Sequence, residues 1–339
     1  MKKSVFIILF VLISFSLFSQ KIDKKTVTAA FYNVENLYDT INDPAIDDEE
    51  FLPQSEKNWN TERYNKKLES LSKVISSINT NELPEIVGFA EIENRKVLED
   101  LVSTTSLKQG NYQIVHQNSP DGRGIDVAFI YRPDEFKYVS HLLIPFIYAE
   151  KPDFKLRDIL YVKGILNKKD TVHVFINHWK SRSGGEKETE KYRVIQSQIL
   201  RTKVDEILTQ NKEAKILIMG DLNDEPRNIS IFEYLKANND LSQSNNLFNL
   251  MLPLADAGNG TLAFRGKWNM LDNIIVSQSF INSNKGFIAE SKQGNVFNPE
   301  FITFVNDKGE KSPNRTYGGK KYFGGYSDHY PVFVTFTKK

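Results

Sequence analysis

The sequence predicts a protein of the α/β class, and three observations support this prediction. Short apolar runs, such as 26–32, 85–90 and 215–219, have the composition and length of buried strands. The stretch 61–78 places apolar residues at helical spacing, as in a helix that covers a sheet. The chain contains neither an internal repeat nor a low-complexity linker, so we expect one domain over residues 20–339.

The composition excludes several classes of protein. With 339 residues, of which 40% are hydrophobic and 26% charged, the chain can form a large core and is unlike a disordered protein. A net charge of +1 gives no overall attraction to nucleic acid, so any affinity for phosphate has to be local. The absence of cysteine excludes disulfides, thiolate metal sites and a cysteine nucleophile.

The N-terminus has the three parts of a secretory signal. Lys2 and Lys3 precede an apolar stretch over 5–18, and Ser19 offers a small residue for cleavage. We therefore predict a signal peptide over residues 1–19 and an exported monomer, periplasmic or extracellular, with no stable membrane anchor. An uncleaved anchor is the alternative, which the shortness of the apolar stretch disfavours.

Polar side chains follow the first strand at the point where it ends. The strand over 26–32 leads into Asn33 and Glu35. Residues 39–56 are acidic but lack the glycine and the alternation of a calcium-binding loop, which indicates a solvated loop.

The same arrangement recurs after the first helix. This helix is expected from Thr61, which can act as its N-cap, to about Ile78. The strand over 85–90 follows and ends in Glu91 and Glu93. A second strand thus delivers carboxylates at its C-terminal end.

Two pairs of neighbouring strands are expected in the middle of the chain. They are 112–116 with 126–131, and 159–165 with 171–176, and each pair is joined by a segment rich in turn residues. The second pair runs into a polar segment that contains His178.

A carboxylate and an amide follow the most apolar strand. A helix from about Thr189 to Thr209 precedes the strand 215–219, after which come Asp221 and Asn223. With one residue between them, these side chains lie on the same side at the mouth of a sheet. Such a pair can orient a water molecule and stabilise a developing negative charge. An ordinary turn is the alternative, because Asp and Asn are common turn residues.

The C-terminal third has fewer recognisable elements. A helix is expected beyond Pro226 and a strand over 273–276. Residues 282–325 show little periodicity, which indicates one long functional loop. The last strand, 332–336, comes directly after the polar segment 327–331.

Six segments, in this order, resemble the successive motifs of the endonuclease/exonuclease/phosphatase superfamily, which includes DNase I. They are Asn33, Glu91, Asn177 to Ser181 around His178, Gly220-Asp221-Leu222-Asn223, Leu271-Asp272-Asn273 and Ser327-Asp328-His329-Tyr330-Pro331. Each motif alone is weak, but the ordered set covers about Val27 to Phe336. The resemblance implies the DNase I-like fold, a four-layer α/β sandwich of two packed mixed β-sheets flanked by helices. It also places the site at one end of both sheets.

The resemblance implies a divalent metal at that site. The ion would be Mg²⁺, with Mn²⁺ or Ca²⁺ as alternatives, bound by Glu91 with Asn33 and Asp328 close by. Hard oxygen ligands of this kind suit magnesium. The residue before Glu91 is not the family's usual glutamine, so Glu93 and Glu35 stay open as ligands, although such carboxylates are commonly only solvated.

The resemblance also implies catalytic roles. Asp221 would orient or deprotonate the attacking water, and Asn223 would donate to a phosphate oxygen. His329, oriented by Asp272, would stabilise the transition state on the phosphate. His178 would be linked to protonation of the leaving oxygen.

Basic residues are candidates for substrate binding. Arg157 corresponds to a phosphate-binding arginine of the DNase I branch, and Lys180 and Arg182 add positive charge nearby. The segment before the last motif carries five cations against one acid, Glu310: Lys308, Lys311, Arg315, Lys320 and Lys321. This surplus favours a polyanionic substrate, although a solvated loop is the alternative.

Other residues invite a functional interpretation with less support. His116, His141 and His173 lack the spacing of a metal site and are expected to be structural. Trp179 and Trp268 flank site motifs, and either stacking on a base or packing in the core would account for them.

We therefore predict a secreted, metal-dependent phosphodiesterase, with a DNA or RNA nuclease as the first choice and nucleic acid or another phosphodiester as its partner. One alternative is a phosphatase or phosphodiesterase acting on a small phosphoester or lipid headgroup. A catalytically inactive binding domain is the other, which the full set of catalytic residue types disfavours.

Overall fold

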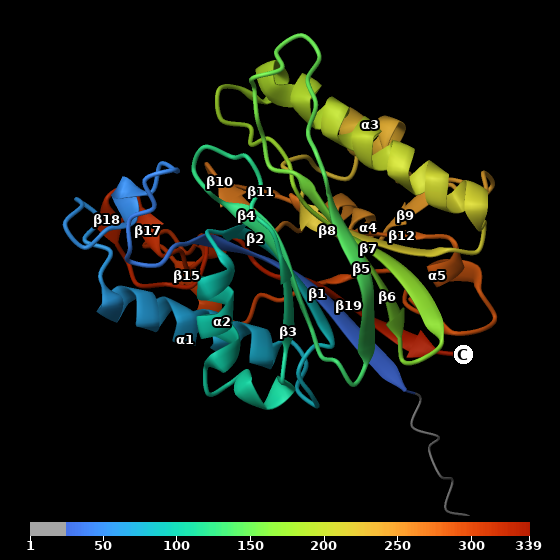
Figure 1. Ribbon diagram of the computed structural model, residues 1–339, viewed down its shortest axis with the longest axis horizontal. Helices are drawn as coiled ribbons and strands as arrows, with labels where there is room; N and C mark the ends of the chain where they lie inside the picture. Colours follow the sequence, from blue (N-terminus) through green and yellow to red (C-terminus); the bar gives the residue numbers. More distant parts are fainter. Residues whose placement is uncertain (1–24) are drawn as a thin grey trace, which may run out of the picture.

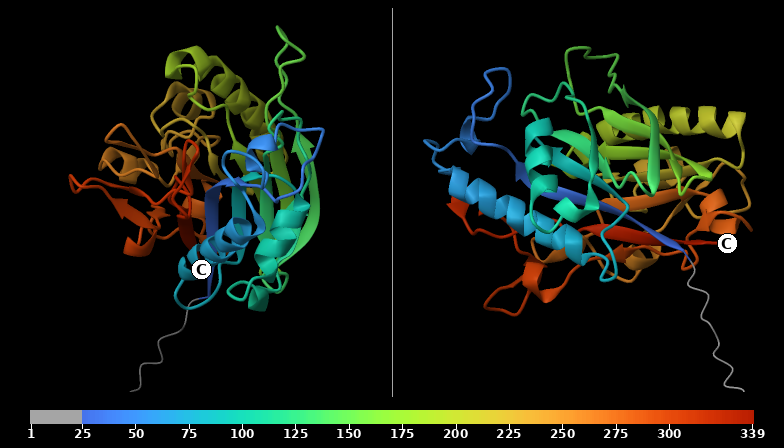
Figure 2. Two further views of the ribbon diagram at one scale, coloured as in Figure 1. Left: turned by 90° about the vertical axis from the view of Figure 1, so that its left-hand side faces the viewer. Right: turned by 60° about the horizontal axis from the view of Figure 1, so that its bottom comes forward.

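The computed structural model describes residues 25–339, which form two β-sheets packed against each other with helices on the outside (Figures 1 and 2). This is the predicted four-layer arrangement. The predicted signal peptide over 1–19 lies outside the described residues. Over 25–339, no helix combines the length and the apolar character that crossing a membrane requires.

The first sheet has the strand order β13-β19-β1-β2-β4-β3, and β14 also pairs with β19. Only β1 and β2 are parallel, because helix α1 connects them and returns the chain to the same end of the sheet. The strands are β1 (Thr26–Leu37), β2 (Ile86–Ile92), β3 (Gln113–His116), β4 (Asp126–Tyr131), β13 (Phe287–Ile288), β14 (Asn295–Val296) and β19 (Val332–Lys338).

The second sheet has the order β5-β6-β7-β8-β12-β9. Here β7 and β8 are the parallel pair, and helix α3 makes the crossover. The strands are β5 (Phe136–Ile144), β6 (Ile159–Leu166), β7 (Asp170–His178), β8 (Lys215–Asp221), β9 (Leu247–Asn249) and β12 (Asp272–Ser277). The two predicted strand pairs form as β3–β4 and β6–β7, and the structure shows that both are antiparallel.

Three apolar clusters hold the layers together. Phe129, Ile176 and Leu217 belong to the core between the sheets, while Leu71 of α1 and Leu200 of α3 belong to the two outer clusters, between helix and sheet. All are fully buried, and burying a side chain of this size stabilises a fold by about 1.5–3 kcal/mol. The helices are α1 (Thr61–Ser77), α2 (Arg95–Ser103), α3 (Glu186–Gln210), α4 (Leu252–Asp256) and α5 (Ser279–Asn282).

Short elements extend the sandwich at several edges. The predicted single loop over 282–325 was wrong, because small hairpins and turns occupy much of it. These elements are η1 (Glu49–Phe51), η2 (Lys108–Gly110), η3 (Ser230–Tyr234), η4 (Glu300–Ile302), β10 (Leu262–Phe264), β11 (Lys267–Asn269), β15 (Thr303–Val305), β16 (Lys311–Pro313), β17 (Tyr317–Gly318) and β18 (Lys321–Tyr322).

Both predicted helix caps were wrong by a few residues. The side chain of Asn60, and not Thr61, accepts a hydrogen bond from the Arg63 amide at the start of α1. Helix α3 begins at Glu186, and Thr189 lies inside its first turn. The stretch 39–56 was predicted as a solvated loop. This was only partly correct, because the Asp48 side chain within it is buried.

Candidate active site

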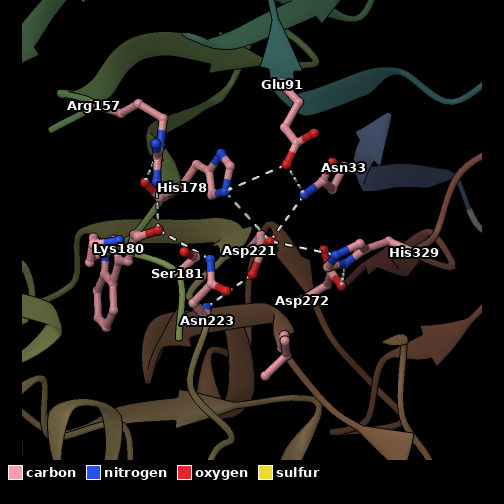
Figure 3. Close-up of polar contacts among 12 residues, drawn as sticks. Asn33, Glu91, Arg157, His178, Lys180, Ser181, Asp221, Asn223, Asp272 and His329 are labelled. Atoms are coloured by element: carbon pink, nitrogen blue, oxygen red, sulfur yellow. Dashed lines mark hydrogen bonds and ion pairs between the residues drawn. The ribbon is translucent and has the colours of Figure 1, made fainter. Parts of the chain in front are cut away.

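The site lies where both parallel strand pairs end (Figure 3). The C-terminal parts of β1, β2, β7 and β8 carry Asn33, Glu91, His178 and Asp221. In a parallel pair both strands finish at the same edge, so each sheet contributes two polar side chains to one place. The sandwich then brings the two edges together.

Irregular backbone directs two of these side chains. Glu91 has a φ of 65° and lies where the pairing of β2 with β4 shifts between Ala90 and Ile92. Asn223, just beyond β8, has a φ of 50°. Left-handed backbone is uncommon for residues other than glycine, and such positions cluster at functional sites. A bulge of this kind re-aims a side chain, here that of Glu91.

Three side chains converge on the Asp221 carboxylate. Its Oδ2 atom lies 3.0 Å from Asn33 Nδ2, 3.7 Å from His178 Nε2 and 3.8 Å from His329 Nε2. The Asn33 amide also donates to Glu91 Oε1 at 3.3 Å. Figure 3 shows Asp221 between the two imidazoles.

The two histidines carry different charges. Burial opposes a charge on His329, but Asp272 and Asp221 overcome it and raise its pKa well above the usual value. Burial, followed by Arg157 and then by other cations, lowers the pKa of His178 well below the usual value. At neutral pH His329 is therefore an imidazolium and His178 a neutral imidazole.

Asp272 orients His329, as expected. Its Oδ2 lies 2.6 Å from His329 Nδ1, and both side chains are buried. The other ring nitrogen, Nε2, is left facing Asp221. Burial raises the pKa of Asp221, and the nearby His329 charge opposes that rise.

The donor set fits a hard divalent cation. One group of ligand atoms, from Asp221, Asp272 and His329, lies within 4.8 Å of one another, and Asp272 Oδ1 is buried without a hydrogen-bond partner in the described chain. Asp272 occupies Nδ1 of His329 at 2.6 Å, which leaves only Nε2 of that ring for a metal. The Glu91 side chain is 16% exposed and lies beside Asn33, so Glu91 is the better metal position than the buried group around His329.

The structure assigns Glu93 and Glu35 to supporting roles. Glu93 Oε2 accepts from the Asp39 amide at 2.6 Å, away from Glu91. Glu35 accepts from the amides of Thr316 and Tyr317, at 2.6 and 3.1 Å. Each carboxylate thus holds a loop to a strand end, and neither is among the groups that face Asp221.

Asn223 is close to Asp221 but currently engaged. Its amide Nδ2 donates to the Trp179 carbonyl at 3.1 Å, and its backbone N–H donates to Asp221 Oδ1 at 2.9 Å. Arg182 donates to the Asn223 carbonyl at 2.8 Å and lies 3.3 Å from Asp224. Arg182 therefore positions the loop, and its contact with substrate stays a prediction.

Arg157 is buried behind His178. Its guanidinium donates to the carbonyls of His178 and Trp179, at 3.0 and 2.9 Å, and to Asp121 at 2.6 Å. A phosphate contact would require exchange of these partners, so substrate binding by Arg157 also stays a prediction. Sequence reasoning missed Arg123, a half-exposed cation beside Asp121 that contributes to lowering the His178 pKa.

Two further predicted residues lie at the edge of the site. Asp328 is 28% exposed and pairs with Arg315 at 2.8 Å, so it is not among the atoms around Asp221. Lys180 is partly buried, and burial, with Arg157 and Arg123, lowers its pKa. Both are accessible enough to meet a substrate or a metal-bound group.

The remaining histidines and tryptophans have protein partners. His116 contacts Asp126 at 3.2 Å, and His141 and His173 contact tyrosine hydroxyls, each at 2.7 Å. Trp179 is fully buried, which favours the core alternative. Trp268 stacks on Tyr330, with 5.5 Å between ring centroids.

Two packed mixed sheets with flanking helices and a polar site at one end are the architecture of the DNase I-like phosphoesterases. Residues 28–338 match the model of the Endonuclease/Exonuclease/phosphatase family. The chain belongs to this family, whose members hydrolyse phosphoric esters, typically with a divalent metal.

Solved structures agree in fold at low sequence identity. A family protein from Bacteroides thetaiotaomicron is 16% identical with a TM-score of 0.58, over 93% of this chain and 99% of that one. The human Nocturnin catalytic domain with bound sulfate is 17% identical with a TM-score of 0.56, over 93% and 95%. A mannosyl-6-phosphatase, also from B. thetaiotaomicron, is 17% identical with a TM-score of 0.56, over 91% and 99%. No curated protein sequence matches the chain significantly.

Proposed function

We propose that this protein is an exported, magnesium-dependent phosphodiesterase of nuclease type. The observation that carries the proposal is the convergence of Asn33, His178 and His329 on one oxygen of Asp221. Hydrolysis of a phosphodiester requires a positioned water, donors to the phosphoryl oxygens and a donor to the leaving oxygen. This arrangement offers a candidate for each.

Asp221 is the group that orients the water. It is held by the Asn33 amide and by the Asn223 backbone N–H, so its free lone pairs point in a defined direction. His329, charged and fixed by Asp272, donates to a phosphoryl oxygen, where negative charge develops. Glu91, Asn33 and Asp328 would hold a Mg²⁺ ion, which would neutralise charge on the phosphoryl oxygens, and Asp328 would have to exchange its Arg315 partner for the ion.

His178 serves the leaving oxygen. In the free protein its ring is neutral, because burial and nearby arginines disfavour the charged form. A substrate phosphate beside the ring favours the imidazolium, since an adjacent negative charge raises a histidine pKa. His178 Nε2 lies 3.9 Å from Glu91 and 3.7 Å from Asp221, on the side of Asp221 away from Asp272.

The basic segment over 308–321 supports a polyanionic substrate. Glu35 fixes it to the end of β1 through the amides of Thr316 and Tyr317, and its Arg315 pairs with Asp328. Lys308, Lys311 and Lys321 are exposed. A nucleic-acid backbone would meet these charges next to the scissile phosphate.

A small phosphoester or lipid headgroup is the second candidate, and two ion pairs favour it. Arg315 pairs with Asp328, and Lys320 with Glu56. Two of the five cations are thereby partly neutralised within the protein. A substrate with one phosphate would need fewer free cations than a nucleic acid.

The test is a substrate panel. Protein comprising residues 20–339 is incubated with supercoiled plasmid, RNA, bis(p-nitrophenyl) phosphate, a set of phosphomonoesters and glycerophosphocholine, each with Mg²⁺ or with EDTA. Magnesium-dependent cleavage of plasmid or RNA is expected. Turnover confined to the small esters would establish the second candidate, and no turnover with Mg²⁺, Mn²⁺ or Ca²⁺ would indicate a binding domain. Export is checked separately, by N-terminal sequencing of the protein recovered outside the cytoplasm.

A further inference from the structure

A cavity of about 600 Å³ lies at the end of the second sheet opposite the active site. Strand β7 passes from this cavity, at Asp170, to the active site, at His178. A strand rises by about 3.3 Å per residue, so the two places are about 26 Å apart. The cavity therefore belongs to neither the metal site nor the substrate rim.

The cavity wall carries more basic than acidic side chains. Five lysines line it, Lys169, Lys215, Lys285, Lys338 and Lys339, against the carboxylates of Asp170 and Glu213, and Lys339 is paired with Glu290 at 2.5 Å. Asp170 is already engaged, because its Oδ2 accepts from the Phe287 amide at 2.7 Å. In a chain with a net charge of +1, this local surplus creates a positive potential.

One of these lysines is built into the wall. Lys215 is 8% exposed, and its Nζ donates to the carbonyls of Phe287 and Ser279, at 2.5 and 3.3 Å. The nearest carboxylate oxygen, on Asp170, is 3.9 Å away. The Phe280 ring, with its centroid 4.9 Å from Nζ, is a further neighbour, and an anion in the cavity would add a full counter-charge to this buried ammonium.

Neutral donors complete the wall. The side chains of Asn167, Thr171 and Asn211 line the same cavity. Its volume falls within the range of sites for small molecules. Lysine ammonium groups beside amides and hydroxyls are the usual partners of phosphate and sulfate oxygens.

We propose that this cavity binds a small phosphorylated or sulfated molecule, at a site separate from the active site. The tetrahedral group lies among Lys169, Lys215 and Lys285, and the rest of the ligand occupies the remaining volume. The inference does not depend on the proposed nuclease activity, because none of these residues contributes to the active site.

His173 gives the site its own reporter. It lines the cavity, while His178 and His329 report on the active site, and the chain has only five histidines in all. Histidine ring resonances of the full protein are followed by NMR with EDTA present, while sodium sulfate is added at constant ionic strength. A saturable shift of the His173 signal is expected, independent of the shifts at His178 and His329.

Matched double variants test the cavity's charge. Lys169→Ala with Lys285→Ala should weaken sulfate binding at His173 about tenfold, which corresponds to about 1.4 kcal/mol. Lys66→Ala with Lys108→Ala removes the same charge from exposed positions of the first-sheet side and should leave the affinity unchanged. An unmoved His173 signal, or an equal loss in both double variants, would overturn the proposal.

Two more probes define the ligand's source. Glucose 6-phosphate should bind at least as tightly as sulfate if the cavity takes a small molecule. Binding of inorganic polyphosphate alone would assign the lysines to an extended polyanion and contradict the small-molecule site.

Discussion

Asn33 Nδ2 lies 3.0 Å from Asp221 Oδ2, although 188 positions separate the two residues and they belong to different sheets. The same amide group donates to Glu91. Asn33 thus links the carboxylate proposed to orient water with the carboxylate proposed to bind metal. The two sheets have to pack in one register for this contact to form.

Glu91→Gln should weaken the apparent Mg²⁺ affinity by about tenfold or more, because a hard cation loses a charged oxygen ligand. The measurement is the rate of ester hydrolysis as a function of Mg²⁺ concentration. Glu93→Gln is the control, since that carboxylate holds the Asp39 amide and should leave the metal dependence unchanged. The reverse result would make Glu93 the ligand.

Asp221→Asn should lower kcat by about 10²–10⁴-fold, as for loss of a positioned acid–base group. Substrate affinity should change little, because the amide preserves the shape of the side chain. Single-turnover kinetics and a melting curve separate loss of chemistry from loss of fold. Asp256→Asn, at an exposed residue paired with Arg227, is the control and should keep full activity. A rate near that of the unaltered protein would reduce Asp221 to a turn residue.

The two histidines should differ in how their loss depends on the leaving group. His329→Ala should slow all substrates, because the imidazolium acts on the transferred phosphoryl group. His178→Ala should slow poor leaving groups most and nitrophenolate least, since nitrophenolate needs no proton. Rates for a series of aryl phosphodiesters provide the measurement. Equal losses across the series would remove His178 from its role at the leaving oxygen.

Lys320→Ala with Lys321→Ala should weaken DNA binding and reduce the slope of log affinity against log salt by about one to two. Lys321 is exposed, whereas Lys320 pairs with Glu56, so the lower end of that range is expected. Fluorescence anisotropy at several salt concentrations gives the slope. Hydrolysis of bis(p-nitrophenyl) phosphate should be unaffected, because this ester is too short to reach the segment. Equal effects on both substrates would favour the small-phosphoester candidate.

Stability should fall on the acid side of neutrality because of His173. Burial, followed by Lys163 and Lys203, lowers the His173 pKa to about 4 in the folded protein. The unfolded chain, with a histidine pKa of about 6.5, binds a proton that the folded chain excludes between these two values. The free energy of unfolding should therefore decrease as the pH falls from about 6.5 to about 4. Urea unfolding in buffers without phosphate or sulfate measures this. His173→Gln should show a weaker pH dependence, and an identical profile would contradict the assignment.

The positions of the main strands could be predicted because their signal is local. The run 215–219 is predicted as a strand from its own apolar residues alone. Strand β8 contains this run and extends two residues beyond it. Strand β5 and helix α2 were missed. Six successive residues of β5 are exposed, among them Tyr138, Val139 and Leu142, so its apolar residues do not mark a buried face.

The roles of similar carboxylates could not be predicted. Glu91 and Glu93 are two residues apart and would share a face on a regular strand. The bulge at Glu91 separates them, so that one faces Asn33 and the other an amide of the acidic stretch. Substrate binding was likewise predicted for Arg157 and Arg182, yet Arg157 donates a hydrogen bond to Asp121 and Arg182 donates one to the Asn223 carbonyl.

The sequence by itself determined the α/β class, the order of the polar motifs and the residue types available for phosphoester chemistry. These depend on periodicity and composition, which are properties of short segments. Only the tertiary structure decided that Asn33, His178 and His329 meet at Asp221 and that His329 is charged while His178 is neutral. The contacts join two sheets, and the charges depend on burial and on neighbours distant in the chain. Neither the contacts nor the charges can be predicted from the sequence of a single segment.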